Sequence, residues 1–196
     1  MTPTPPLVLD ERAPVSVRAR IGTLLADAAT ADFAVARIRL AALDLAAREV
    51  ARVERCRVLL GTLDAATLLD AAESGPAGAA GRLMVLRSFA ASGRLEVRSA
   101  GLAGWTPDFS IFRGTGTTAL LGAHYFGAPY PVFGPSFTAI VEQPVSQHLL
   151  EVRFEELWRR GHDVLPAIQV VLERAHALAV ESGGPGGGRD RPVPAL

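Results

Sequence analysis

Three polar residues around one short alternating segment have the types and spacing that nucleophilic chemistry uses. The segment GWTPDFSIFRG, residues 104–114, places Asp108 and Ser110 two positions apart, and His124 lies in the next predicted strand. Because residues i and i+2 of a strand share a face, these side chains form an Asp–Ser–His trio on paper. The sequence has no G-x-S-x-G nucleophile elbow, so a histidine hydrogen-bonded within the fold or at an interface is the stronger interpretation of His124.

The composition excludes several other kinds of site. All 20 basic residues are arginine, so the chain has no lysine for a Schiff base or a phosphate-binding loop. The single cysteine, Cys56, lies in the apolar run CRVLLG; it rules out an intramolecular disulfide and a cysteine zinc cluster, and a buried structural thiol is expected. The remaining histidines are spaced by 14 residues, so we expect no metal site, and no cofactor motif is present. They are His148, His162 and His176.

Strand and helix patterns alternate along the chain that positions these residues. Short alternating or apolar runs predict strands at residues 32–38, 57–61, 92–99, 108–112, 118–126 and 136–143. Helical periodicity predicts helices at residues 17–28, 40–52, 64–73, 79–91, 145–160 and 164–181. The predicted fold class is therefore α/β, with a mixed β-sheet of about six strands flanked by helices on both faces.

Proline and glycine mark the boundaries of one predicted domain. Residues 1–14 are expected to form an extended Pro-rich arm, residues 15–181 a single α/β domain, and residues 182–196 a flexible Gly/Pro-rich tail. No basic-then-apolar leader precedes the domain, and no apolar run is long enough to cross a membrane. We therefore expect a cytoplasmic protein without membrane insertion, and the single cysteine fits a reducing compartment.

The order and hydrophobic pattern of these segments, from about residue 17 to residue 160, resemble one phospholipase D-like domain. The segments that carry the resemblance are, in chain order, RLEVRSAG, PDFSIFRG, ALLGAHYF, FTAIVEQP and FEELW. In that family the corresponding elements are an SGRLEVR-type strand, the strand with a His-x-Lys pair, a Leu-Leu-Gly-Ser-x-Asn strand, a later strand, and a helix ending in Phe-x-x-x-Trp. The resemblance implies the same α/β sandwich.

The resemblance also identifies the positions that would carry the family's chemistry, and every one of them is changed. The family uses a histidine to attack phosphorus, a second to protonate the leaving oxygen, and Lys and Asn to stabilise the developing charge. Asp108 and Ser110 stand at the His and Lys positions, and Ala123 and Tyr125 at the Ser and Asn positions. An aspartate anion repels a phosphodiester and serine supplies no cation, so the standard mechanism is excluded. The domain is expected to be a degenerate member, a pseudoenzyme.

Aromatic residues gather next to these strands, and they have two interpretations. Core packing with a covered loop is one; an interface or ligand surface is the other, because exposed aromatic rings are strong binding anchors. Single-domain members of the resembled family pair across a two-fold axis, so the resemblance implies a homodimer that buries this face. The candidate interface residues are Trp105, Phe109, Tyr125, Phe126 and Tyr130.

Three functions remain open at this point. The first is a non-catalytic phospholipase D-like domain that acts as a binding or assembly module, as a homodimer or with an active partner protein. The second is a hydrolase rebuilt around Asp108, Ser110 and His124. The third is a nucleic-acid-associated accessory protein, which a formal net charge of +0 does not favour. A local basic patch could still serve it, formed by Arg37, Arg39, Arg52, Arg55 and Arg57.

Overall fold

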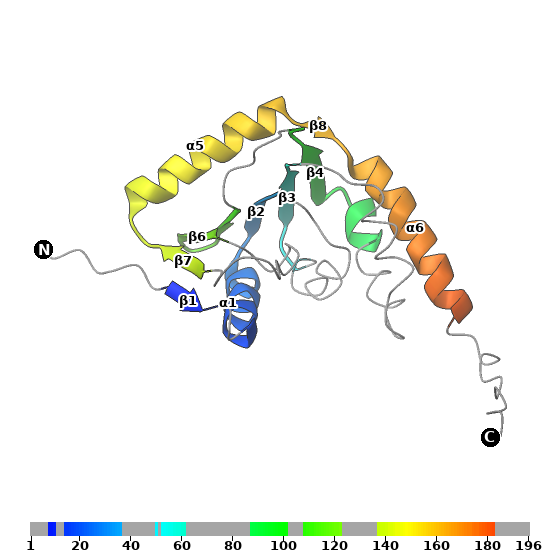
Figure 1. Ribbon diagram of the computed structural model, residues 1–196, viewed down its shortest axis with the longest axis horizontal. Coiled ribbons are helices and arrows are strands. Elements are labelled where there is room, and N and C mark those ends of the chain that lie inside the picture. Colours follow the sequence, from blue (N-terminus) through cyan, green and yellow to red (C-terminus); the bar gives the residue numbers. More distant parts are fainter. Residues whose placement is uncertain are drawn as a thin grey trace, which may run out of the picture.

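In the part of the chain that the structure describes, eight strands form one mixed β-sheet (Figure 1). The computed structural model describes residues 8–10, 14–36, 50, 52–61, 87–101, 108–122 and 137–182. The strands are β1 (Val8–Asp10), β2 (Thr30–Val35), β3 (Arg55–Leu60), β4 (Leu95–Ser99), β5 (Phe109–Arg113), β6 (Thr117–Gly122), β7 (Phe137–Val141) and β8 (His162–Asp163). Their order across the sheet is β1-β7-β6-β5-β2-β3-β4-β8. The predicted α/β class with a mixed sheet is confirmed.

The centre of the sheet joins parallel and antiparallel pairing. β2 pairs parallel with β3, which pairs parallel with β4, whereas β2 pairs antiparallel with β5 on its other side. β2 and β3 are covered on both faces, which is why their sequences are near-continuous apolar runs. The buried polar residues of the central strands β2 and β5 are Asp32 and Ser110.

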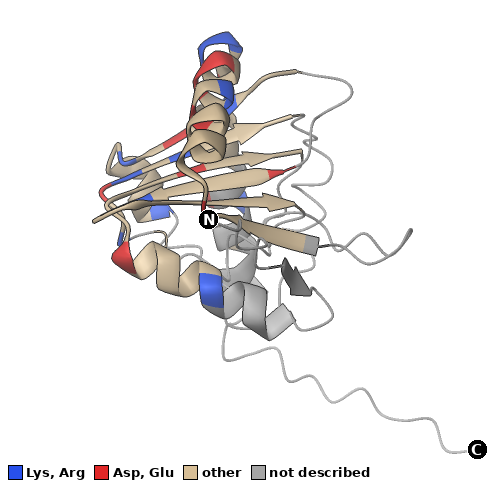
Figure 2. Cartoon of the chain, turned by 90° about the vertical axis from the view of Figure 1, so that its left-hand side faces the viewer, with Lys and Arg blue, Asp and Glu red and all other residues tan. Residues whose placement is uncertain are grey.

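Helices cover both faces of the sheet, as predicted. α1 (Pro14–Asp27) and α5 (Pro144–Arg160) lie on opposite faces, and α6 (Leu165–Ser182) follows at the β4–β8 side (Figures 1 and 2). These three match the helices predicted at residues 17–28, 145–160 and 164–181. Of the predicted helix at 79–91 the structure describes residues 87–91, which are helical. The predicted helix at 64–73 lies outside the described residues, as does nearly all of that at 40–52.

Two short edge strands raise the strand number from about six to eight in the described part of the chain. β1 lies within residues 1–14, which the proline content predicts to be an extended arm, and it pairs antiparallel with β7. β8 connects α5 to α6 and pairs antiparallel with β4. With 3 and 2 residues respectively, neither strand is long enough to show a period in the sequence.

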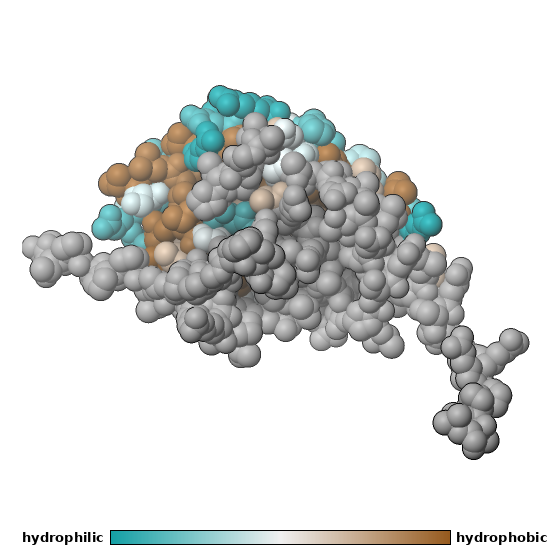
Figure 3. Space-filling model, viewed as in Figure 1, coloured by the Kyte–Doolittle hydropathy of each residue, from teal (hydrophilic) through white to brown (hydrophobic). Residues whose placement is uncertain are grey.

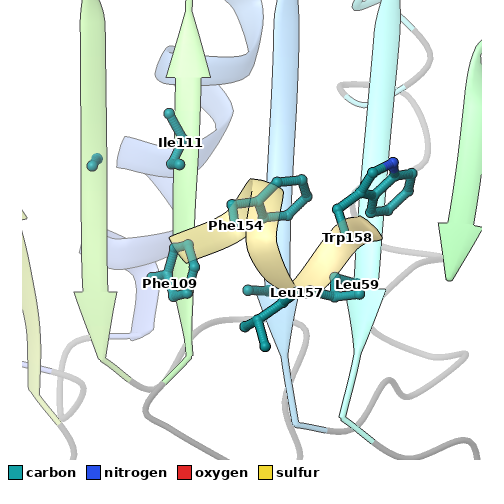
Figure 4. Close-up of a cluster of buried hydrophobic side chains, with 8 residues drawn as sticks. Leu59, Phe109, Ile111, Phe154, Leu157 and Trp158 are labelled. Carbon is teal, nitrogen blue, oxygen red and sulfur yellow. The ribbon is translucent and has the colours of Figure 1, made fainter. Parts of the chain in front are cut away.

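α5 packs onto the sheet through a cluster of buried apolar side chains (Figure 4). Phe154 stacks on Trp158 with ring centroids 5.5 Å apart. The rings of Phe154 and Phe109 are T-shaped, with centroids 6.4 Å apart. Pro144 begins the helix, where a missing N–H costs no hydrogen bond, and Gly161 follows its last residue. The cluster comprises Ala34, Leu59, Phe109, Ile111, Ala119, Phe154, Leu157 and Trp158.

Under α5, the carboxylate of Asp32 joins the sheet to the helix through ion pairs. Arg57 on β3 binds it through two hydrogen bonds of 2.7 Å, from Nε to Oδ1 and from Nη2 to Oδ2. Arg113 on β5 adds an ion pair from Nη1 to Oδ2 at 2.6 Å. The two arginines then reach α5, where Arg57 binds Glu155 at 2.7 Å and Arg113 binds Glu151 at 3.0 Å.

The guanidinium of Arg57 is additionally covered by aromatic rings of α5. It lies 4.7 Å from the ring centroid of Phe154 and 5.3 Å from that of Trp158. Burial by itself disfavours the cation, but hydrogen bonds to Asp32 and Glu155 more than offset this effect, so the pKa of Arg57 is raised. The Asp32 network, meaning Asp32, Arg57, Arg113, Glu151 and Glu155, thus fixes α5 against three strands.

We predict that Asp32→Asn lowers the free energy of unfolding by roughly 3 kcal/mol, because it leaves two buried or half-buried guanidinium groups without their shared carboxylate. Urea denaturation followed by circular dichroism measures the change. Glu96→Gln is the matched control: the Arg55–Glu96 pair has side chains 53% and 35% exposed, so its loss costs at most about 1 kcal/mol. Equal losses in the two variants would show that the Asp32 network contributes no more than a surface pair.

We also predict that Gly114→Ala destabilises the protein by about 2 kcal/mol, because a Cβ at this turn position would overlap the backbone carbonyl oxygen of Asp27 at the end of α1. Gly116→Ala, two residues on in the same turn, meets no atom within 4 Å and should change stability by under ~0.5 kcal/mol. Thermal unfolding of both variants tests the difference. Similar midpoints would contradict the close approach of this turn to α1.

Candidate functional site

The edge of the sheet at which β2, β3 and β4 end holds the candidate site. Parallel strands bring their carboxyl ends to one edge, which is where α/β sheets bind ligands. β2 ends at Val35 and β3 at Leu60, and Asp108 immediately precedes antiparallel β5. Asp108 therefore lies at this edge, beside the end of β2.

The carboxylate of Asp108 holds the backbone beyond β2. The Ala36 backbone N–H donates a hydrogen bond of 2.8 Å to Oδ1 of Asp108. The backbone N–H of Gly122, the last residue of β6, donates to the carbonyl oxygen of Asp108 at 2.8 Å. Asp108 is half-buried and connects the ends of the strands on either side of β5. Its carboxylate thus satisfies a backbone donor.

Ser110 shares the face of Asp108 but is enclosed in the core. In register it lies between Phe33 of β2 and Leu120 of β6, on the face opposite α5. Its exposed fraction is 0%, and among the described residues its Oγ has no hydrogen-bond partner. A hydroxyl without access to solvent is poorly placed for nucleophilic attack.

The other predicted site residues divide into one core residue and several that the structure does not describe. Phe109 is 2% exposed and packs against Phe154 beneath α5, so its ring belongs to the core of the chain. The structure thus brings Asp108 and Ser110 to one face of β5 and does not describe the third member of the trio. His124, Trp105, Tyr125, Phe126 and Tyr130 lie outside the described residues.

Of the arginines that could form a basic patch, two are bound to carboxylates. Arg57 belongs to the Asp32 network, and Arg55 pairs with Glu96 at 2.7 Å. Arg52 is exposed, and Arg37 and Arg39 lie outside the described residues.

The sequence did not lead us to predict the Asp32 network. The pattern that indicates it is a carboxylate within the apolar strand ADFAV and an arginine within the apolar run CRVLLG.

The predicted structural role of the cysteine agrees with its surroundings. Cys56 is fully buried in β3. Burial, with a smaller contribution from the negative charge of Asp32, raises the pKa of its thiol. The reactive thiolate is therefore disfavoured.

Within the described ranges, no group of three or more His, Cys, Asp or Glu side chains could hold a metal ion. Likewise, no described helix is both long and apolar enough to cross a membrane.

A pocket of about 290 Å³ lies between residues 87–91 and α6, and Asp108 does not line it. Its lining residues are Arg87, Ser88, Ala91, Gln169 and Glu173.

Comparisons with known proteins identify the fold. No protein-family model and no curated protein sequence matches the chain. Among solved structures, TrmBL2, an archaeal chromatin protein whose structure shows a novel mode of DNA binding, is 17% identical with a TM-score of 0.48. That match covers 83% of this chain and 56% of TrmBL2, so the chain spans little more than half of that protein's length. Nuc from Salmonella typhimurium, a phospholipase D family member, is 13% identical with a TM-score of 0.51, over 81% of this chain and 97% of Nuc. The chain therefore has a phospholipase D-like fold.

Proposed function

We propose that this chain is a non-catalytic domain of phospholipase D-like fold that works as a binding or assembly module, as a homodimer. The observation that carries the proposal is the state of β5. At the two positions where the resembled family has its His-x-Lys pair, one side chain holds a backbone N–H and the other is enclosed by the core. Both side chains therefore have structural roles in the sheet.

The electrostatics of the phosphodiesterase reaction support this proposal. Transfer of a phosphoryl group needs positive charge where the phosphoryl oxygens gain negative charge. The chain contains no lysine, and Asp108 would place an anion where the family has its nucleophilic histidine. A phosphodiester would be repelled from this edge.

The two alternative functions have less support. A rebuilt hydrolase needs a Ser110 hydroxyl that a substrate can reach, yet Ser110 is 0% exposed. A nucleic-acid accessory role needs unneutralised arginines, yet two of the five candidates, Arg55 and Arg57, bind carboxylates. We therefore propose the binding or assembly module alone.

An activity assay tests the non-catalytic part of this proposal. We expect the purified chain to release no nitrophenol above the buffer rate from bis(p-nitrophenyl) phosphate or p-nitrophenyl acetate. An active phospholipase D-like enzyme, assayed in parallel on the phosphodiester, controls for the conditions. Turnover that His124→Ala abolishes while the circular dichroism spectrum stays unchanged would overturn the proposal and favour the rebuilt hydrolase.

Substitutions at Asp108 and at Ser110 have opposite expected effects on stability. Asp108→Ala removes the acceptor of the Ala36 N–H and should lower the free energy of unfolding by about 1–3 kcal/mol, whereas Asp108→Asn keeps an acceptor oxygen and should cost less. Ser110→Ala removes a buried hydroxyl without a described partner and should leave stability equal or higher. A stable Asp108→Ala variant would contradict the structural role of this carboxylate.

A further inference from the structure

The outward face of α5 carries a row of exposed aliphatic side chains. Val145 is 73% exposed, Leu149 62% and Val152 42%. Their spacing of four and three residues places them on one side of the helix. That side faces away from Phe154 and Leu157, which pack onto the sheet. The three residues are called the α5 stripe below.

Other partly exposed apolar side chains lie on the sheet side of α5. Leu121 of β6, Val141 of β7 and Leu150 of α5 are partly buried against the core and retain some exposure. Figure 3 shows hydrophobic surface gathered on the side where α5, β6 and β7 lie. An exposed apolar surface of this kind commonly marks an interaction site.

The N-terminal half of α5 is held in place by side-chain hydrogen bonds to the sheet. Nε2 of Gln147 donates to the carbonyl oxygens of Thr117 at 3.1 Å and Val141 at 2.8 Å. The Asp32 network holds the helix from Glu151 onwards. The α5 stripe is therefore a preformed surface, which lowers the entropic cost of binding a partner.

We propose that a second copy of this chain covers the α5 stripe, with the two α5 helices packed antiparallel about a two-fold axis. In this arrangement Leu149 of each copy lies opposite Val152 of the other, so the same residues meet twice, as an isologous interface requires. The four-and-three spacing is the spacing at which helices interlock side by side.

The charges at the two ends of α5 support a second copy in this orientation. Glu142 lies just before the helix, and Arg159 and Arg160 end it; all three are exposed. Antiparallel packing places Glu142 of one copy near Arg159 of the other, at both ends of the interface. Parallel packing would instead bring the arginines of both copies together, which is repulsive.

This inference rests on the proposed function, because it identifies the surface through which the module assembles. It differs from the aromatic face around residues 105–130 that the family resemblance implies. The two locations make different predictions for single substitutions, so the dimer and its interface can be tested separately.

Sedimentation velocity of the full chain at micromolar concentrations tests the apolar contact. We expect the wild-type chain to sediment as a dimer and Leu149→Glu to raise the dissociation constant at least tenfold, because it buries a carboxylate in each half of the interface. Val170→Glu on α6 is the matched control: Val170 is 65% exposed and lies outside the α5 stripe, so the dimer should persist. Circular dichroism confirms that each variant is folded.

A charge exchange tests the orientation. Glu142→Arg and Arg159→Glu should each raise the dissociation constant several-fold, and the double variant should restore it to near the wild-type value. If the two substitutions weakened the dimer independently, for example by disturbing the fold, their effects would add in the double variant and would not cancel.

Each outcome decides a separate claim. A wild-type dimer that Leu149→Glu leaves intact overturns the α5 interface, while the assembly module stands. A wild-type chain that is monomeric at all concentrations overturns both this inference and the homodimeric part of the proposed function. The phosphodiesterase assay decides the non-catalytic part independently. Weakening by Leu149→Glu, persistence with Val170→Glu and rescue in the double charge variant together support the inference.

Discussion

Two guanidinium groups from neighbouring strands meet the carboxylate of Asp32 beneath α5, and the position of the helix depends on this contact. A carboxylate that is 2% exposed must be paired, since an unpaired buried charge is costly. Arg57 and Arg113 satisfy Asp32, and each also binds a glutamate of α5. A rotation or shift of α5 would remove these glutamates from the arginines. The Asp32 network therefore specifies which face of α5 points to the sheet and which faces outward.

The two faces of β5 have different roles in the fold. Phe109 and Ile111 belong to the core beneath α5 and contribute apolar burial to the fold. Asp108 and Ser110 alternate with them and point to the other face. Neither side chain contributes to the core under α5, and the Asp108 carboxylate accepts a hydrogen bond from the backbone N–H of Ala36. The apolar face of β5 therefore holds the helix whatever side chains stand at positions 108 and 110.

The central strands were predictable because burial on one or both faces leaves a pattern in the sequence. LEVRS of β4 alternates, and RCRVLL of β3 ends in a run of apolar residues that both faces bury. β1 and β8 gain their strand character from the neighbours with which they pair, so no local period predicts them. The sequence marks Asp32 as an unusual residue in an apolar strand, but it does not predict the partners of Asp32. Arg57 and Arg113 are 25 and 81 residues away from Asp32 in the sequence, and a buried charge alone does not identify its partners.

The distribution of residues on α5 reverses part of the usual amphipathic pattern. A helix that covers a sheet ordinarily turns its apolar side inward and its charges outward. Here Glu151 and Glu155 bind arginines of the sheet, while Val145, Leu149 and Val152 face outward. The ion pairs of the Asp32 network and the packing of Phe154 and Trp158 hold the inner face of α5 to the sheet. The outer apolar residues take no part in these contacts. The proposed interface with a second copy accounts for them, and the opposite charges at the two ends of the helix fit its antiparallel arrangement.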